Sequence, residues 1–383
     1  MKSSGFLGLL LSALVLGSAC TKKSETAAPA SDVIKIGEVG SMTGSEATFG
    51  ISTHQGIELA IQEMNNAGGI KGKKLQLVTL DNQGKSDEAA LAATKLISQE
   101  KVTALLGEVA SSRSLAMAPI AQQNKVPMVS PSSTNPKVTE IGDYIFRVCF
   151  IDPFQGTVMA KFAADSLKVK KVAILRDVKN DYSMGLADYF AETFKKGGGE
   201  IVMDQSYSAG DKDFKSQLTA IRSKKPEAIF VPGYYTEVGL IARQARELGL
   251  KVPMMGGDGW DSPKLKEIGG TALDGSYFSN HYSAEDQSPH VQDFIKKYKE
   301  KYGAIPDGLA AMGYDAARVL GDAMIRAKSL SATDIREALA QTRDYQGVTG
   351  KITIDSNRNA VKPAVVLKVE KGDFKYQTTI NPS

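Results

Sequence analysis

The chain has 383 residues, of which 42% are hydrophobic and 23% charged. This composition is typical of a globular protein and not of a disordered or fibrous one. Lys and Arg number 47 and Asp and Glu 43, with the two signs interspersed, which excludes the concentrated basic segment expected of a nucleic-acid-binding protein. A single core seldom supports a chain of this length, so two domains are expected.

The chain begins with a pattern typical of an export signal. Lys2 precedes an apolar run over residues 6–16, and residues 17–19 are small. The run is too short to remain as a membrane span. We therefore expect residues 1–19 to be a signal peptide and the protein to be exported, to the periplasm or the cell surface.

Cys20 stands where a bacterial lipoprotein carries its lipid-bearing cysteine. Gly17 departs from the leucine that usually lies three positions before that cysteine, so ordinary signal cleavage with an incidental Cys20 stays open as the alternative. Residues 20–32 are small and polar, which suits a lipid anchor followed by a flexible spacer. Contact with a membrane is expected through this anchor only.

From residue 33 onward, strand-like and helix-like patterns alternate. The expected strands are residues 33–39, 74–80, 102–106 and 127–130, and the expected helices are residues 50–66, 86–99 and 111–124. Strands joined by helical crossovers imply a parallel sheet with helices on both faces.

A second series follows Pro153. Its expected strands are residues 171–175, 201–207, 228–231 and 252–256, and its expected helices are residues 182–196, 214–223 and 238–248. Two similar α/β units are predicted.

The regular alternation of strand-like and helix-like patterns ends near residues 277–283. Three helical stretches follow, over residues 290–302, 309–327 and 333–342, with short strands at 351–354 and 364–369. Helices without their own strands indicate that the chain returns to complete the first unit. We expect one lobe from residues 33–151 with 282–350 and a second from 152–281 with 351–383. Such lobes, joined by several hinge strands, form a cleft that opens and closes.

Motifs for metal, nucleotide or nucleophilic chemistry are missing from the sequence. His54, His281 and His290 have no metal-ligand spacing, and each is expected at the surface. No phosphate-binding loop or dinucleotide fingerprint occurs. Cys149 lies in a strand-like apolar segment and is expected to be buried and unreactive, without a disulfide. No cofactor or metal is expected, and an exported enzyme that works with side chains alone is kept as an alternative.

Polar residues gather where predicted strands end, and ligands of open α/β sheets bind at that edge. Two turns of the first unit, Gly107-Glu-Val-Ala-Ser-Ser112 and Ser130-Pro-Ser-Ser-Thr-Asn-Pro136, offer hydroxyls and free N–H groups to a carboxylate. In the second unit, Tyr234 and Asp258 follow strands. Taken singly, these residues could equally cap helices or stabilise turns. Together they predict a cradle for a zwitterion, with hydroxyls opposite an acid.

Several segments resemble the branched-chain amino-acid (Leu/Ile/Val) substrate-binding proteins of bacterial ABC importers. The resemblance is carried by Ile34-Lys-Ile-Gly-Glu-Val-Gly-Ser-Met-Thr-Gly44, Asn65-Asn-Ala-Gly-Gly-Ile-Lys-Gly72 and Gly210-Asp-Lys-Asp-Phe214, and it runs in order from about residue 33 to the C-terminus. It implies the type I periplasmic binding protein fold, with two doubly wound α/β lobes joined by a multi-strand hinge. It also implies a non-enzymatic, monomeric protein that captures an amino acid and delivers it to the membrane permease subunits of an ABC transporter.

The resemblance assigns ligand-binding roles to ten residues. Ser111, Ser132 and Thr134 match positions that bind the ligand carboxylate and ammonium, Tyr182 and Tyr234 match aromatic residues of the second lobe, and Asp258 matches a glutamate that binds the ammonium. Phe49, Val109, Ala110 and Tyr314 match positions around the ligand side chain.

Two departures from the family pattern leave the preferred side chain open. The cysteine at the position of Ala110 and its partner near residues 82–84 are missing, and Asp258 is one methylene shorter than the family's glutamate. Within the family, branched, aromatic and small polar amino acids and non-amino carboxylates are all bound. A sensory or receptor protein of the same fold, for an amino acid or a small carboxylate, remains the alternative to transport.

Overall fold

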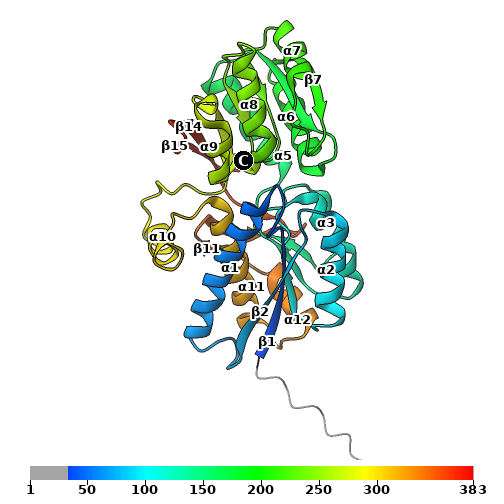
Figure 1. Ribbon diagram of the computed structural model, residues 1–383. Coiled ribbons are helices and arrows are strands. Elements are labelled where there is room, and N and C mark those ends of the chain that lie inside the picture. Colours follow the sequence, from blue (N-terminus) through cyan, green and yellow to red (C-terminus); the bar gives the residue numbers. More distant parts are fainter. Residues whose placement is uncertain (1–32, 383) are drawn as a thin grey trace, which may run out of the picture. The chain divides into compact units, whose positions relative to one another are not determined.

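The computed structural model describes residues 33–382, which belong to one compact unit. The expected signal peptide, Cys20 and spacer lie outside the described residues. Two α/β lobes, each built around its own sheet, make up the described chain (Figure 1). Two lobes with doubly wound sheets confirm the predicted fold class.

The first lobe is built on a five-stranded sheet in the order β2-β1-β3-β4-β5, and every pairing is parallel. Its strands are β1 (Val33–Gly40), β2 (Lys74–Asp81), β3 (Ala104–Leu106), β4 (Met128–Ser130) and β5 (Ile145–Arg147). Its first helices are α1 (Ala47–Asn66), α2 (Ser86–Ser98), α3 (Ser111–Gln123) and α4 (Lys137–Glu140). The period of apolar residues thus predicted this part of the chain closely.

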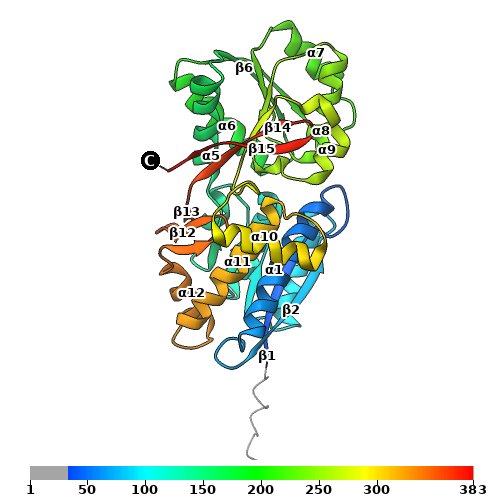
Figure 2. The ribbon, with the colours of Figure 1, turned by 90° about the vertical axis from the view of Figure 1, so that its left-hand side faces the viewer.

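The second lobe contains a seven-stranded sheet in the order β15-β14-β10-β9-β8-β6-β7. Its parallel strands are β6 (Lys171–Asp177), β7 (Glu200–Tyr207), β8 (Ala228–Phe230), β9 (Met254–Gly256) and β10 (Tyr277–Asn280). The antiparallel strands β14 (Ala364–Glu370) and β15 (Asp373–Ile380) complete one edge, seen side-on in Figure 2.

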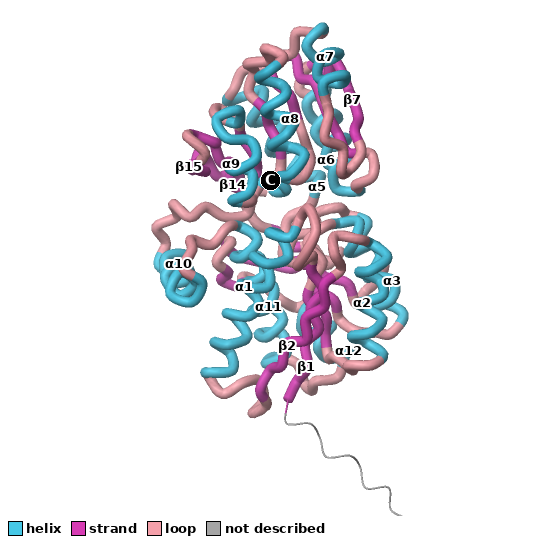
Figure 3. Tube along the Cα trace, in the orientation of Figure 1, coloured by secondary structure: helices cyan, strands magenta, loops and turns pink. Residues whose placement is uncertain are grey.

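Helices cover the second sheet as they cover the first (Figure 3). They are α5 (Asp152–Lys161), which continues as a π-turn over Phe162–Ser166, α6 (Asp181–Lys196), α7 (Lys215–Ser223), α8 (Tyr235–Glu247) and α9 (Pro263–Gly269), with short 3₁₀ turns at Asp258–Trp260 and Gly270–Leu273. Helix α5 and strand β15 were not predicted. Helix α5 begins with Asp-Pro, which is typical of a helix start, but its apolar residues show little one-sided pattern.

After β10 the chain packs against elements of the first lobe. Helices α10 (Pro289–Tyr302), α11 (Gly308–Arg326) and α12 (Ala332–Ala340) follow, and α11 packs along α1. A small sheet of β11 (Tyr345–Gly347), β12 (Gly350–Ile354) and β13 (Ala360–Val361) comes next. Ile352 and Ile354 lie in the same core cluster as the β1 residues Ile34 and Ile36, although the sequence analysis placed residues 351–383 with the second lobe. Only from β14 onward does the chain join the second sheet.

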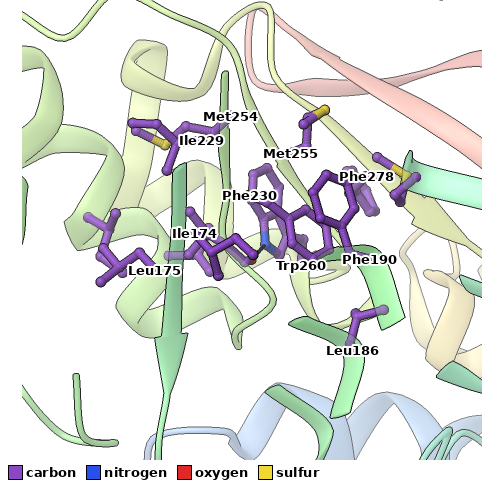
Figure 4. Close-up of a cluster of buried hydrophobic side chains, with 14 of the residues drawn as sticks. Ile174, Leu175, Leu186, Phe190, Ile229, Phe230, Met254, Met255, Trp260 and Phe278 are labelled. Atoms are coloured by element: carbon purple, nitrogen blue, oxygen red, sulfur yellow. Dashed lines mark hydrogen bonds between the residues drawn. The ribbon is translucent and has the colours of Figure 1, made fainter. Parts of the chain in front are cut away.

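The core of the second lobe anchors the turn that follows β9. Trp260 is fully buried among Phe230, Phe190 and Phe278 (Figure 4). Its indole N–H donates to the carbonyl oxygen of Val231 at 2.9 Å. A large buried aromatic with a satisfied N–H fixes the backbone that carries it, so the residues just before Trp260 are held firmly.

Candidate binding site

A small cavity lies between the lobes, at the carboxyl ends of strands from both sheets. In this closed form the cavity volume is only about 10 Å³. Its lining residues are Phe49, Val109, Ser111, Ser132 and Leu309 from the first lobe and Tyr182, Tyr234, Asp258 and Gly259 from the second. This position is where ligands bind in open α/β sheets.

The first helix turn at the cavity belongs to α3, and a buried ionic network fixes the loop before it. Glu108 is fully buried; its carboxylate accepts from Ser41 Oγ at 2.9 Å and from the N–H of Ala110 at 2.6 Å. Arg113 lies 3.1 Å from the same carboxylate and 2.6 Å from Glu46. Ser111 therefore begins a rigid helix whose N-terminal N–H groups and partial positive charge suit an anion.

Three hydroxyls line up beside this helix start. Ser111 Oγ accepts from the N–H of Asn135 at 3.2 Å. The hydroxyls of Ser132 and Thr134, in contrast, are buried and have no hydrogen-bond partner among the described residues. Buried hydroxyls are rarely left unpaired, so the hydroxyl of Ser132, which lines the cavity, is available to a bound molecule.

Asp258 of the second lobe lines the same cavity, and two side chains hold its carboxylate. Its Oδ1 accepts from Gln155 Nε2 at 2.8 Å, and its Oδ2 lies 3.1 Å from His281 Nε2. Burial lowers the pKa of His281 to about 4, although Asp258 opposes the shift. The ring is therefore neutral at pH 7, and Nε2 must carry its proton in order to donate to the carboxylate. The two donors leave lone pairs of Asp258 free for a cation.

Close packing explains the glycines on either side of Asp258. A side chain at Gly257 would place its Cβ 2.4 Å from the Tyr182 hydroxyl oxygen, and one at Gly259 would meet the carbonyl oxygen of Gly233 at 2.7 Å. The N–H of Gly259 donates to the same Tyr182 hydroxyl at 3.2 Å. The Gly-Asp-Gly sequence thus lets the acid approach the cavity and the aromatic wall together.

Aromatic rings from both lobes form the wall of the cavity. Tyr182 and Tyr234 stack with their ring centroids 5.4 Å apart. Phe49 of the first lobe packs edge-on against Tyr234 and against Tyr235, at 5.3 and 4.9 Å. Burial raises the pKa of Tyr182 and of Tyr234, so both phenols stay neutral. This wall suits an apolar group and contributes no charge.

Direct hydrogen bonds join the lobes around the cavity. Ser112 Oγ donates to Asp181 Oδ2 at 2.8 Å, and Asn135 Nδ2 donates to the carbonyl oxygen of Asp181 at 2.8 Å. Thr236 Oγ1 donates to the carbonyl oxygen of Ser45 at 2.8 Å on another side. The structure therefore has the cleft closed.

Most of the residues proposed from the sequence come together here. Seven of them line the cavity: Phe49, Val109, Ser111, Ser132, Tyr182, Tyr234 and Asp258. Ala110 and Thr134 are buried beside these residues, but neither lines the cavity. Their binding roles remain proposals.

Tyr314 is not part of this cavity. Its hydroxyl donates to Glu63 at 2.6 Å and its ring packs on Phe294. Leu309, earlier on the same helix α11, lines the cavity instead. Five residues advance a helix by about 500°, which turns Tyr314 away from the face that Leu309 presents.

The histidines include one that the sequence analysis placed wrongly. His290 is exposed and His54 is partly buried beside Glu38. His281, however, is buried at 3% exposure against Asp258 and stacks on Phe150. Cys149 is buried as expected, and burial raises the pKa of its thiol to about 12.

Residues 33–382 were also compared with the requirements of a metal site and of a membrane-spanning helix. In this range, no three His, Cys, Asp or Glu side chains are grouped so as to bind a metal ion. None of its helices has the length and apolar character needed to cross a bilayer.

Two lobes that close on a small polar cavity define a solute-binding protein. Residues 33–373 match the family described as "Periplasmic binding protein", and the chain belongs to this family. Members of this family bind substrates and are not enzymes.

Relatives whose names state a ligand agree with this class. A curated "Leu/Ile/Val-binding protein homolog 3" from Brucella melitensis is 32% identical over 334 residues, 86% of this chain and 89% of the relative. The crystal structure of a leucine-binding protein from Thermotoga maritima is 45% identical, with a TM-score of 0.88, over 91% of this chain and 99% of that one. A branched-chain amino-acid transporter substrate-binding protein from Streptococcus pneumoniae, solved with isoleucine, is 36% identical, with a TM-score of 0.87, over 91% and 100%.

Proposed function

We propose that the protein captures an apolar α-amino acid in the cavity between its lobes and delivers it to an ABC transporter. The observation that carries this proposal is the polarity of the cavity. The cavity is lined by the unpaired hydroxyl of Ser132, by Ser111 at a helix N-terminus, by the fixed carboxylate of Asp258 and by aromatic rings. Leucine and isoleucine, the ligands named for two of the relatives, carry a carboxylate, an ammonium and an apolar side chain.

Each end of the ligand has its own set of partners in this proposal. The carboxylate binds at Ser111 and at the hydroxyls of Ser132 and Thr134. The ammonium binds Asp258. It donates charge-assisted hydrogen bonds to the lone pairs that remain free on the carboxylate. Phe49, Val109, Ala110 and Leu309 of the first lobe contact the ligand side chain, with Tyr182 and Tyr234 covering it from the second.

Ligand capture couples to lobe movement. The ligand docks on the first lobe, and closure then brings Tyr182, Tyr234 and Asp258 over it. We propose the lobe boundaries of the sequence analysis, with residues 351–361 moved to the first lobe because Ile352 and Ile354 pack in its core. Only a closed form that gains contacts with the ligand is favoured by binding, and the transporter recognises that form.

The proposal includes export, and tethering through Cys20. The residues concerned lie before residue 33, so the tether rests on the order of apolar run, small residues and Cys20 alone. The protein then acts as a monomer held at a membrane surface, where a captured ligand stays close to the transporter.

A ligand screen tests the function. Thermal unfolding of the purified protein is measured with each of the twenty amino acids, and hits are followed by small-angle X-ray scattering. We expect leucine, isoleucine or valine to raise the midpoint of unfolding by several degrees, since a ligand at about 100 times its Kd adds about 2.7 kcal/mol. The absence of both stabilisation and compaction with every amino acid would overturn the proposal.

A further inference from the structure

Three buried acids from the two lobes lie in one region of the closed cleft. Glu46 of the first lobe directly precedes helix α1 and is 8% exposed. In the second lobe, Glu237 belongs to the first turn of α8 and is 6% exposed, and Asp177 ends strand β6 and is 4% exposed. None of the three lines the ligand cavity. They therefore belong to the contact between the lobes and not to the proposed ligand contacts.

A hydrogen bond between the lobes brings Glu46 and Glu237 together. Thr236 Oγ1 donates to the carbonyl oxygen of Ser45 at 2.8 Å, and these two residues directly precede Glu237 and Glu46 in the chain. Opening of the cleft would break this bond and separate the two acids. In the closed form the charge of Glu46 acts on Glu237, so closure places two like charges in the same buried region.

The cation nearest to Glu46 is already shared. Arg113 lies 2.6 Å from Glu46 and 3.1 Å from Glu108, both in the first lobe. One guanidinium thus serves two buried carboxylates, and a negative charge remains on the first lobe at this point. The second lobe brings further negative charge toward it when the cleft closes.

Backbone groups hold the two acids of the second lobe. Glu237 accepts from the N–H of Gly210 at 3.0 Å, and Asp177 accepts from the N–H groups of Lys179 and Ala209, each at 3.0 Å. Within the described part of the chain, neither carboxylate forms an ion pair with a lysine or an arginine. Their negative charges are therefore oriented by N–H dipoles and are not neutralised by a cation in contact.

Burial raises the pKa of Glu46, of Asp177 and of Glu237. Arg113 opposes the shift of Glu46, and backbone N–H groups oppose the other two shifts. An acid whose pKa is higher in the closed form than in the open form takes up protons on closure. The other charged or titratable groups of this region are Glu108, Lys179, Asp211, Tyr207 and Tyr234, of which the two phenols stay neutral.

We propose that Glu237 and Glu46 form a like-charge pair across the cleft that opposes closure and speeds the release of a bound ligand. The inference goes beyond the proposed function, on which it rests only for its measurement. An amino acid in the cavity offsets the repulsion through its own contacts, whereas the empty closed form has nothing that offsets it. The repulsion weakens as the pH falls, because a protonated carboxyl group can donate a hydrogen bond to its neighbour.

Glu237→Gln tests this pair. Glutamine keeps an oxygen that can accept from the N–H of Gly210 and removes the charge. Isothermal calorimetry measures the binding of L-leucine, L-isoleucine and L-valine at about pH 8 and about pH 5. We expect the variant to bind about three times more tightly than the unaltered protein at the higher pH, where the lost charge opposed closure. The gain should shrink at the lower pH, and stopped-flow measurements should show slower release.

Glu247→Gln is the matched control. Glu247 ends the same helix α8, and its side chain is 56% exposed and 4.0 Å from Lys215. We expect this variant to bind like the unaltered protein at both pH values. If Glu237→Gln gives no gain at the higher pH, or the same gain at both, the pair does not oppose closure.

Two further outcomes are distinct from these. Equal gains in Glu237→Gln and Glu247→Gln would reflect the net charge of the protein and would overturn the proposal as well. If the unaltered protein binds none of the three amino acids, the proposed function fails and this inference fails with it.

Discussion

The carboxylate of Asp261 in the second lobe accepts a hydrogen bond from the backbone N–H of Gly308 in the first, at 2.6 Å. Gly308 is the first residue of helix α11, and the same oxygen of Asp261 also accepts from Asn280 Nδ2 at 2.7 Å. A carboxylate at a helix N-terminus is favourably placed. This contact joins the lobes next to Leu309, so it stabilises the closed cleft from outside the proposed ligand contacts.

Gly308→Ala tests that contact. A Cβ at this position would lie 2.5 Å from Asp261 Oδ2, so the lobes could not reach the same closed form. We expect ligand affinity to fall about tenfold or more, since a hydrogen bond to a charged group contributes about 1.5–3 kcal/mol. Thermal unfolding without ligand should change little. Unchanged affinity by calorimetry would show that closure does not need this contact.

The same carboxylate predicts a pH dependence of binding. Burial and the nearby Asp307 raise the pKa of Asp261, with Asp258 adding to the shift, and Tyr282 also lies within its field. In an open cleft the solvated acid would titrate near its ordinary value of about 4. The closed form therefore binds more protons, and closure weakens as the pH rises from about 5 toward neutral.

Asp261→Asn is the control for this dependence, because it removes the titrating group and leaves the contribution of His281 in place. We expect the logarithm of the Kd to rise more steeply with pH for the unaltered protein than for the variant. Parallel curves from calorimetry between about pH 5 and 8 would contradict the explanation.

Removing Asp258 should have the largest single effect on binding. Asp258→Ala leaves the ligand ammonium without the carboxylate that Gln155 and His281 hold in place. The expected loss is about 2–5 kcal/mol, the range for losing one partner of a buried charge pair. Calorimetry that finds the affinity unchanged would remove Asp258 from the site.

His281 should act through Asp258 and not on the ligand. His281→Phe keeps a ring to stack on Phe150, at 3.8 Å between centroids in the native protein, but removes the donor to the carboxylate. We expect affinity for the amino acid to fall about tenfold, in line with about 1.5 kcal/mol for a hydrogen bond to a charged group. His281→Gln, which supplies an N–H, should recover part of this loss. Equal affinities of the two variants would disprove the positioning role.

The ionic network behind helix α3 should contribute mainly to stability. Arg113→Leu leaves Glu108 and Glu46 buried without their cation, and breaking such a pair costs about 3–5 kcal/mol. Arg176→Leu is the matched control, because its partners Asp188 and Asp204 are exposed and exposed pairs contribute about 1 kcal/mol or less. Urea unfolding of the two variants should show this difference, and similar losses would count against the network.

The sequence predicted the cavity best where a polar turn directly follows a strand. Ser111, Ser132 and Asp258 all stand in such turns, and the parallel sheet brings these turns to one edge. His281, Gln155 and Asp152 lie where the chain crosses between the lobes. Their neighbours are far away in the sequence, so no local pattern indicates that they meet.

The orientation of helices about their own axes explains two further differences between the sequence predictions and the structure. The choice between Leu309 and Tyr314 depends on which side of α11 faces the cleft, and the first six residues of this helix, 308–313, are all small or apolar and show no polar side. Helix α5 was missed because opposite sides of it are buried, for example at Val158 and Ala160. A helix without a clear polar side has no periodicity by which to find it.

The enclosure of the cavity has a kinetic consequence. Ser111, Tyr182 and Asp258 are 1%, 3% and 6% exposed in the closed form, so we expect release of a captured molecule to require reopening of the lobes. The time for which a ligand stays bound then depends on how often the two lobes reopen. A ligand that makes more contacts in the closed form keeps the lobes closed for longer, so ligands that differ in affinity differ in their rate of escape.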